Sequence, residues 1–269
     1  MHLYDRFNRK IDYLRISITD RCNMRCKYCM PYSQNITWLK HEDILSYEEI
    51  RDITKYLVSQ GIRKVRLTGG EPLVRKDIGI LVKMLAEING IEDLSMTTNG
   101  ILLATFAERL KSAGLNRVNI SLDTLDADTF RKISSHGELS DVLEGIRIAQ
   151  KVGLAPVKIN CVDSKYNTDQ DIANVKAFGE KHGIPVRIIH QMDLAGGIFT
   201  TVEGGQGGSC NSCNRLRLSS DGKIYPCLFS DLNYDIKETG IKKALTLALN
   251  NKPRKGYNNK NQSFNQLGG

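Results

Sequence analysis

The chain lacks the segments that would place it in a membrane or direct it out of the cell. None of its apolar runs approaches the ~18 residues that a membrane span needs, and the N-terminal stretch MHLYDRFNRK is polar and charged rather than a secretory signal. We therefore expect a cytoplasmic protein with no membrane partner. Thiols stay reduced in that compartment and structural disulfides are rare, so the seven cysteines indicate metal binding or catalysis.

A clustered charge of one sign is also absent. The net charge is +8, but the 38 lysines and arginines are dispersed along 269 residues rather than gathered in one stripe. This pattern predicts no nucleic-acid partner. It favours small anionic partners such as phosphates, although a basic solvated surface would need no partner at all.

The middle of the chain alternates between two kinds of segment. Runs rich in β-branched residues predict strands over 13–19, 64–68, 92–98, 117–122, 155–162 and 185–190. Helical spacing of apolar residues predicts helices over 46–61, 78–88, 102–114, 139–153 and 168–183. Such a repeat predicts an α/β fold with a parallel sheet. About six βα units are too few for a closed eight-stranded barrel, so we expect an open, partial TIM-type barrel.

The repeat ends near residue 193, which suggests how the chain is divided. Residues 195–209 contain six glycines in fifteen positions, a composition typical of a flexible connection. We therefore expect a partial barrel over 1–194, a Gly-rich connection over 195–209 and a short C-terminal region over 210–269. Cys161 lies alone in a predicted strand and is expected to be a buried core thiol.

Three cysteines follow the first predicted strand, at the end where such a barrel carries its functional groups. Cys22, Cys26 and Cys29 are spaced C-x3-C-x2-C, and no fourth cysteine lies beside them. An iron–sulfur cube takes thiolate ligands, normally four, so three thiolates would leave one iron open to bind another group. A zinc site or a purely structural role remains the alternative.

Polar motifs follow the next three predicted strands in turn. LTGGEP (67–72), TTNG (97–100) and SLD (121–123) all fall at carboxyl ends, which meet at one edge of a parallel sheet. Two adjacent glycines in the first of these would let the backbone approach a ligand closely. A tight turn is the simpler interpretation of that pair.

The cysteine spacing, Tyr28 before the last cysteine, and the run Gly69-Gly70-Glu71-Pro72 together resemble the radical S-adenosylmethionine (SAM) superfamily. The resemblance implies a [4Fe–4S] cluster on Cys22, Cys26 and Cys29. Its open iron would bind SAM, and an electron would cleave the sulfonium to methionine and a 5′-deoxyadenosyl radical. The same resemblance implies SAM contacts from Tyr28, Gly70, Glu71, Thr98, Ser121 and Met192.

A second cysteine set narrows the resemblance. Cys210, Cys213 and Cys227 are spaced C-x2-C-x13-C, and no histidine follows His190. Zinc is the natural alternative for a C-x2-C pair. The segment is similar to the GTP 3′,8-cyclase (MoaA) family of molybdenum-cofactor biosynthesis, which implies a second [4Fe–4S] cluster whose open iron binds the guanine of GTP. The implied product is 3′,8-cyclo-7,8-dihydro-GTP, and the final Gly268-Gly269 matches that family's tail, which reaches into the active site.

The resemblance also assigns a role to basic residues. It implies that seven of them hold the triphosphate and ribose of GTP: Arg15, Lys64, Arg66, Lys158, Arg187, Arg215 and Arg217. Guanidinium groups suit phosphate oxygens. The alternation within KVRLT and RLRL should point both basic side chains of each strand to one side.

One segment departs from the family pattern. The family has a longer stretch between the sixth strand and the second cysteine set, where this chain has only 194–209. The chain is therefore expected to be a minimal cyclase, a two-cluster relative acting on another nucleotide or a peptide, or a shortened variant of low activity. A non-catalytic iron–sulfur or zinc module is a further alternative. The resemblance also implies an electron donor such as flavodoxin or ferredoxin, and it allows a homodimer.

Overall fold

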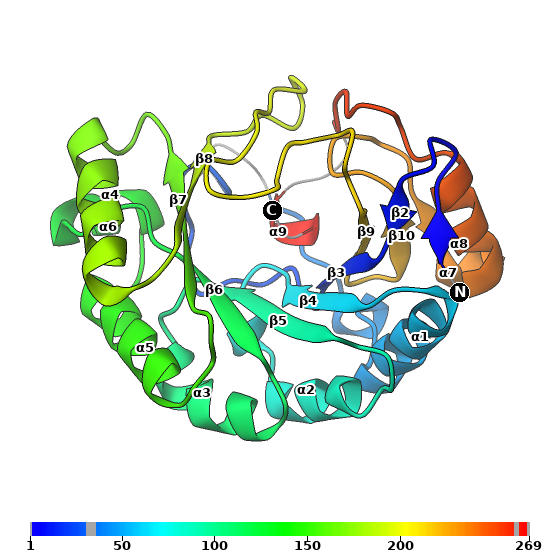
Figure 1. The fold of residues 1–269 in the computed structure, drawn as a ribbon, viewed down its shortest axis with the longest axis horizontal. Coiled ribbons are helices and arrows are strands. Elements are labelled where there is room, and N and C mark those ends of the chain that lie inside the picture. The colour runs from blue at the N-terminus through cyan, green and yellow to red at the C-terminus, as the bar shows by residue number, and fades with distance from the viewer. Residues whose placement is uncertain (1, 31–35, 261–263, 268–269) are drawn as a thin grey trace.

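The computed structural model describes residues 2–30, 36–260 and 264–267, and it shows a curved sheet with helices on its outer side (Figure 1). Seven strands of the sheet run parallel in the spatial order β9-β3-β4-β5-β6-β7-β8. They are β3 (Tyr13–Ser17), β4 (Lys64–Thr68), β5 (Asp93–Thr98), β6 (Arg117–Ser121), β7 (Lys158–Asp163), β8 (Val186–His190) and β9 (Arg215–Leu218). The predicted α/β class and open parallel sheet are thus confirmed.

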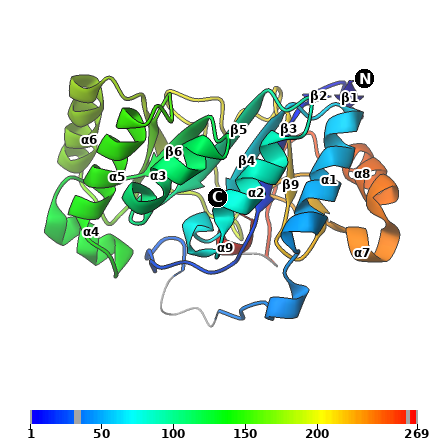
Figure 2. The ribbon, with the colours of Figure 1, turned by 90° about the horizontal axis from the view of Figure 1, so that it is seen from below.

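Helices connect the parallel strands and cover their outer face, as the view from below also shows (Figure 2). They are α1 (Tyr47–Gln60), α2 (Ile78–Ala86), α3 (Leu103–Ser112), α4 (Ala127–Ser134), α5 (Leu139–Lys151) and α6 (Asp169–His182), with short 3-10 turns η1 (His41–Asp43) and η2 (Pro72–Val74). Each helix predicted from sequence is present within two residues of its expected ends. α4 was not predicted, because its eight residues carry too short an apolar pattern.

Local sequence explains where the helices begin and end. The Ser46 hydroxyl accepts a hydrogen bond from the Glu49 amide, while the Glu49 carboxylate accepts one from the Ser46 amide. This capping box satisfies two backbone donors that the first turn of α1 would otherwise leave unpaired. The helix stops at Gly61, whose φ of 132° is a conformation that glycine adopts most readily.

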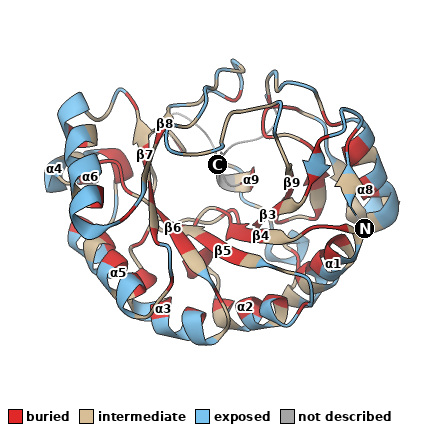
Figure 3. Ribbon diagram, viewed as in Figure 1, coloured by how far each residue is buried: buried red, intermediate tan, exposed pale blue. Residues whose placement is uncertain are grey.

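The parallel strands have two different faces. In β4, Val65 and Leu67 are fully buried in the core between sheet and helices, and the core residues form a continuous band behind the sheet (Figure 3). Lys64 and Arg66, which alternate with them, point to the inner side of the curve. Because side chains of a strand alternate between its faces, the same strands build an apolar core outside and a polar surface inside.

The C-terminal region extends this sheet instead of forming a separate one. β9 pairs with β3, and it is followed by antiparallel β10 (Lys223–Tyr225) and β11 (Tyr234–Asp235). Helices α7 (Ile236–Thr239) and α8 (Ile241–Asn250) lie at this end of the sheet, opposite α4 and α6 (Figure 2). α9 (Phe264–Leu267) lies inside the ring of strands (Figure 1).

The Gly-rich segment crosses the open side of the barrel between β8 and β9 (Figure 1). Its Glu203 pairs with Ile188 at the edge of β8, with backbone hydrogen bonds of 3.0 and 3.3 Å in the two directions. The segment therefore covers part of an otherwise open sheet edge. The division of the chain at residues 194 and 209 stays a prediction.

Two further features complete the architecture. The first strands, β1 (Leu3–Tyr4) and β2 (Lys10–Ile11), form a small hairpin outside the main sheet. Among the described residues, no helix combines the length and apolar composition that crossing a bilayer requires.

Candidate active site

A cavity of about 550 Å³ lies on the inner side of the curved sheet. Side chains from the parallel strands line its wall, and the Gly-rich segment lines another side through Thr200, Val202 and neighbouring glycines. The described lining includes all seven basic residues singled out from the sequence: Arg15, Lys64, Arg66, Lys158, Arg187, Arg215 and Arg217. Met192 and the three cysteines of the second set line the same cavity.

Strand register explains why the arginines meet. Arg15 on β3 is opposite Arg217 on β9 on one side and opposite Arg66 on β4 on the other. Parallel neighbours at one register lie about 4.8 Å apart and point to the same face. The three strands thus present a row of guanidinium groups across the cavity wall.

This concentration of like charge perturbs the arginines themselves. Burial lowers the pKa of Arg15 well below its usual value, and Arg217 beside it adds to the effect. Burial lowers the pKa of Arg217 to about 10, with Arg215 contributing in the same direction. Buried like charges repel one another and lose hydration, which costs free energy. An anion bound in the cavity would offset this cost.

The cavity offers little negative charge of its own and leaves polar atoms unpaired. Asp93 is the carboxylate among the described lining residues, and Arg117 holds both of its oxygens, at 2.8 and 2.6 Å. The buried Tyr13 hydroxyl and Arg187 Nε have no hydrogen-bond partner among the described residues. Since buried polar groups are normally satisfied, these atoms favour a polar ligand here.

The first cysteine set lies on the loop that leaves β3. The Cys29 and Met30 amides donate to the Cys26 carbonyl at 3.0 and 2.8 Å, which folds the loop into a tight turn. The loop is also held against the end of α4, where the Arg25 amide donates to the Ser134 carbonyl at 2.9 Å. All three thiols are half-buried.

The electrostatic surroundings keep these thiols protonated in the absence of a cation. Burial raises the pKa of Cys22 to about 11 and that of Cys29 to about 12, and it raises the pKa of Cys26 well above its usual value. The iron ions of a cluster would supply the compensating positive charge, because thiolate rather than thiol is the metal ligand. Three thiols of this kind on one loop fit the donor set of a four-iron cube with one open position.

The two glycines of the LTGGEP motif approach protein backbone. A Cβ at Gly69 would lie 2.5 Å from the Thr19 carbonyl oxygen, and one at Gly70 would lie 2.1 Å from that of Arg21. The Gly70 and Glu71 amides donate to the same two carbonyls, at 2.8 and 2.7 Å. The glycines therefore allow this loop to pack against the stem of the cysteine loop, which the sequence alone did not indicate.

Glu71 and Thr98 form a buried hydrogen-bonded unit beside that contact. The Glu71 carboxylate accepts from the Thr98 hydroxyl at 2.8 Å, from the Asn99 amide at 2.7 Å and from the Leu73 amide at 3.0 Å. Burial raises its pKa to about 7, against the effect of these donors. The Asn99 side chain in turn lies 3.9 Å from the Cys22 sulfur, which links this unit to the first cysteine set.

A small cavity of about 30 Å³ adjoins the first cysteine set, and Cys26, Tyr28 and Ser121 line it. The Tyr28 hydroxyl donates to the Asp123 carboxylate at 2.7 Å. Burial raises the pKa of Asp123 to about 6, and this hydrogen bond opposes the rise. The structure therefore groups Tyr28 and Ser121 with the first set, whereas Met192 lies with the larger cavity.

The second cysteine set lies at the opposite end of the strands. Cys210 and Cys213 precede β9, and Cys227 follows the antiparallel β10, so all three lie near the amino end of β9. The first set follows the carboxyl end of β3, which is parallel to β9. The two thiol sets therefore lie at opposite ends of the parallel strands, and the second set lines the large cavity. Among the described residues, no three Cys, His, Asp or Glu side chains converge closely enough for a single metal ion.

The C-terminal tail enters this space. Leu267 is fully buried against Leu194, Tyr225 and neighbouring apolar residues, and its carbonyl accepts a hydrogen bond from Arg217 Nη1 at 3.1 Å. Gly268 and Gly269, which the sequence placed at the active site, lie outside the described residues. The last described residue nevertheless contacts an arginine of the cavity wall.

Comparison with known proteins identifies the family. A model described as "Radical SAM superfamily" matches residues 16–179, and one described as "Molybdenum Cofactor Synthesis C" matches residues 181–266. The GTP 3′,8-cyclase of Thermodesulfovibrio yellowstonii is 43% identical, with 87% of each chain covered. That of Petrotoga mobilis is 39% identical, with 99% of this chain and 100% of the relative covered. The chain belongs to the GTP 3′,8-cyclase family.

Solved structures support the fold of this GTP 3′,8-cyclase family member. Streptococcus suis SuiB, crystallised with S-adenosylmethionine, superposes with a TM-score of 0.71 over 91% of this chain and 67% of its own, at 16% identity. AdoMet-bound anSMEcpe gives 0.66 over 91% and 82%, also at 16% identity. The predicted partial barrel of the radical SAM superfamily is confirmed.

This family member is shorter than some relatives. The comparison with the Petrotoga cyclase runs over 324 aligned positions, whereas this chain has 269 residues. The alignment therefore contains positions where this chain has no counterpart. We expect that they fall between β8 and β9, where the Gly-rich segment 195–209 pairs with β8 and lines the cavity.

Several cavity residues escaped the sequence analysis. Arg117 alternates with Asn119 along β6, and the same period-two reasoning that was applied to β4 could have placed it on the inner face. Lys252 and Arg9 carried no signal, because each reaches the second cysteine set through contacts distant in the sequence. Asp123 belongs to the SLD motif, but the sequence did not indicate a separate role for it.

Proposed function

We propose that the chain converts GTP to 3′,8-cyclo-7,8-dihydro-GTP in molybdenum-cofactor biosynthesis, using two [4Fe–4S] clusters, SAM and a one-electron donor such as flavodoxin or ferredoxin. Membership of the GTP 3′,8-cyclase family supports this proposal. The observation that carries it is the large cavity, which a row of arginines, including the buried Arg66 and Arg217, lines together with three thiols. A peptide site would have no use for so many inward cations.

The chain's residues divide into two groups in this proposal. When bound, the first cluster and SAM supply a 5′-deoxyadenosyl radical. Cys22, Cys26 and Cys29 would hold that cluster, while Tyr28, Gly70, Glu71, Thr98, Ser121 and Met192 would orient SAM and exclude water. The placement of Cys26, Tyr28 and Ser121 around one small cavity supports the grouping.

The second group would hold the substrate. Cys210, Cys213 and Cys227 would bind a second cluster beside the guanine, since their thiols open onto the cavity. Arg15, Lys64, Arg66, Lys158, Arg187, Arg215 and Arg217 would bind the triphosphate and ribose. A triphosphate carries enough negative charge to offset the repulsion among the arginines, and guanidinium groups match its oxygens in geometry.

The test is product analysis under anaerobic conditions. Reconstituted protein is incubated with dithionite, SAM and each of the four nucleoside triphosphates in turn, and 5′-deoxyadenosine and cyclised nucleotide are measured in the same sample. We expect cyclised product with GTP. Formation of 5′-deoxyadenosine without product from any nucleotide would instead favour the relative that acts on a peptide.

A further inference from the structure

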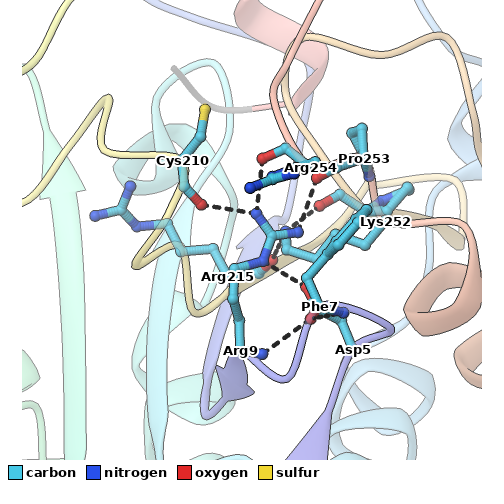
Figure 4. Close-up of polar contacts among 9 residues, drawn as sticks. Asp5, Phe7, Arg9, Cys210, Arg215, Lys252, Pro253 and Arg254 are labelled. Atoms are coloured by element: carbon cyan, nitrogen blue, oxygen red, sulfur yellow. Dashed lines mark hydrogen bonds and ion pairs between the residues drawn. The ribbon is translucent and has the colours of Figure 1, made fainter.

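Two buried cations lie beside the second cysteine set, in addition to the row of arginines described above. Lys252, which follows α8, is 1% exposed, and Arg9, from the turn between β1 and β2, is 9% exposed. The close-up shows both side chains directed into the same region near Cys210 and Arg215 (Figure 4). Neither is among the residues proposed to bind GTP.

Lys252 holds the backbone next to two of the cysteines. Its ammonium donates to the Arg215 carbonyl at 2.7 Å and to the Pro226 carbonyl at 2.5 Å. Arg215 follows Cys213 by two positions, and Pro226 immediately precedes Cys227. One side chain therefore fixes the two chain segments that carry these thiols relative to each other.

Lys252 also brings an uncompensated charge. In the described part of the chain, no carboxylate forms an ion pair with it, and its hydrogen-bond acceptors are neutral carbonyls. A fully buried ammonium in neutral surroundings is costly. Negative charge at the neighbouring thiols would offset that cost, which suggests that the site is built to hold thiolates.

Arg9 fixes the third cysteine. Its Nη1 donates to the Cys210 carbonyl at 2.7 Å, and Nη2 donates to the Pro253 carbonyl at 2.8 Å (Figure 4). Its Nε pairs with the Asp5 carboxylate at 2.6 Å. The N-terminal hairpin is thereby tied both to the second cysteine set and to the residue that follows Lys252. Because Asp5 pairs with Arg9, the positive charge at this place that no described carboxylate offsets comes from Lys252 together with Arg215.

We propose that Lys252 and Arg9 are positioning residues for the second cysteine set, which together fix the three cysteine-bearing segments and place positive charge beside their thiolates. This inference rests on the proposed second cluster. It assigns the N-terminal hairpin a role at the second cysteine set, although Arg9 and Cys210 are more than 200 positions apart in the sequence. Positive charge near an iron–sulfur cluster stabilises the reduced form and so raises the reduction potential.

The experiment isolates the second cluster within the full chain. Cys22, Cys26 and Cys29 are all replaced by alanine, so that only the second set can bind a cluster, and the protein is reconstituted anaerobically. The parent should load about four irons per chain. Lys252→Met and Asp5→Asn are then made in this parent, and Lys83→Met, an exposed lysine on α2, is the matched control. Iron content and the midpoint potential, from a titration followed by electron paramagnetic resonance, are measured for each.

The two variants should shift the potential in opposite directions. Lys252→Met removes a positive charge and should make the potential more negative. Asp5→Asn removes a negative charge and should make it less negative by a smaller amount, while Lys83→Met should leave it unchanged. A merely structural role could lower iron loading in both variants but could not produce shifts of opposite sign.

The possible results distinguish an electrostatic effect on the second cluster from a merely structural role. If Lys252→Met fails to load a cluster, the sign of the Asp5→Asn shift decides, and an unchanged potential there overturns the inference. A parent that loads about four irons and whose variants all share one potential overturns the inference alone. A parent that takes up zinc in place of iron removes the proposed second cluster, and the inference fails with it.

Discussion

The two cysteine sets contain the same number of thiols but lie in opposite electrostatic surroundings. Around the first set, burial raises the pKa of Cys26 and of Cys22, and the carboxylates Asp123 and Glu71 add to those rises. Around the second set, burial would raise the pKa of Cys213, but nearby cations led by Lys252, with a backbone hydrogen bond, leave that pKa lowered. Burial still raises the pKa of Cys227, although Lys252 and Arg217 oppose the rise. Carboxylates thus add to the effect of burial at the first set, whereas cations oppose it at the second set, which lies at the opposite end of the parallel strands.

The difference suggests that the two sites perform different tasks. The first set depends on the cations of its cluster to become thiolate, and the described residues that line the small cavity beside it are uncharged apart from Asp123. The second set belongs to a surface that attracts anions generally, both thiolates and phosphates. A division between radical generation at one end and substrate binding at the other follows, and the predictions below test it in order of decreasing effect.

Loss of a cysteine should separate the two ends most clearly. Cys22→Ala, Cys26→Ala and Cys29→Ala should each abolish SAM cleavage, because each removes a ligand of the cluster that donates the electron. Cys213→Ala should keep cleavage and lose cyclised product. The measurement is the yield of 5′-deoxyadenosine and of cyclised nucleotide in one sample, with dithionite as reductant. If all three first-set variants still formed 5′-deoxyadenosine, these cysteines would not bind the cluster that cleaves SAM.

Loss of one arginine should have the next largest effect. Arg217→Ala removes at least one charge-assisted hydrogen bond, worth about 1.5–3 kcal/mol, which corresponds to GTP binding about 10-fold to 150-fold weaker. Uncoupled SAM cleavage should persist, since Arg217 is on β9 near the second set.

The matched control is Arg147→Ala on the outer helix α5. Arg147 is exposed and pairs with Glu144 at 2.6 Å, so its loss removes the same charge far from the cavity. Exposed ion pairs contribute about 0–1 kcal/mol, and GTP affinity should not change. Equal affinity for GTP in the two variants would show that the cavity is not a triphosphate site.

Most strands and helices of the barrel, and the candidate site residues that belong to contiguous motifs, could be predicted from local sequence. The strand KVRLT placed Lys64 and Arg66 on one face because side-chain alternation is a property of any strand. The cysteine spacing and the glycine pair were readable because they are contiguous motifs. In each case the physical cause lies within a few residues of its effect.

What the sequence did not reveal depends on distant segments meeting. β9 pairs with β3, although the two strands lie about 200 positions apart in the sequence. Each strand has only four or five residues, too few to specify its partner. The close packing of Gly69 and Gly70 against the backbone near Thr19 likewise requires the folded sheet. Lys252 gives no signal in the sequence, and only the folded structure shows that it is buried.

Removal of the last two residues should have an intermediate effect. A chain ending at Leu267 should keep SAM cleavage and give less cyclised product, because the tail reaches the cavity wall where the Leu267 carbonyl accepts from Arg217. The comparison is the ratio of cyclised nucleotide to 5′-deoxyadenosine in full-length and shortened chains. An unchanged ratio would mean that the tail has no part in placing the substrate.

The smallest expected effect concerns the acidic surroundings of the first set. Asp123 lines the same small cavity as Cys26, and its carboxylate accepts from the Tyr28 hydroxyl at 2.7 Å and from the Val162 amide at 2.8 Å. Asp123→Asn keeps the shape of the side chain and an oxygen that accepts from the Val162 amide. The new amide group can donate to the Tyr28 hydroxyl, which would then accept this hydrogen bond. Removing a negative charge beside the cluster should make its reduction potential slightly less negative.

This shift can be measured in chains that retain only the first cluster, with the second-set cysteines Cys210, Cys213 and Cys227 replaced by alanine. The control is Asp128→Asn, an exposed carboxylate at the start of α4, which should leave the potential unchanged. Asp123→Asn removes a negative charge beside the first set, and Lys252→Met removes a positive charge beside the second. If Asp123→Asn does not shift the potential, or shifts it to more negative values, the acidic character of the first site does not act on its cluster, and the electrostatic contrast between the two sets cannot explain their different tasks.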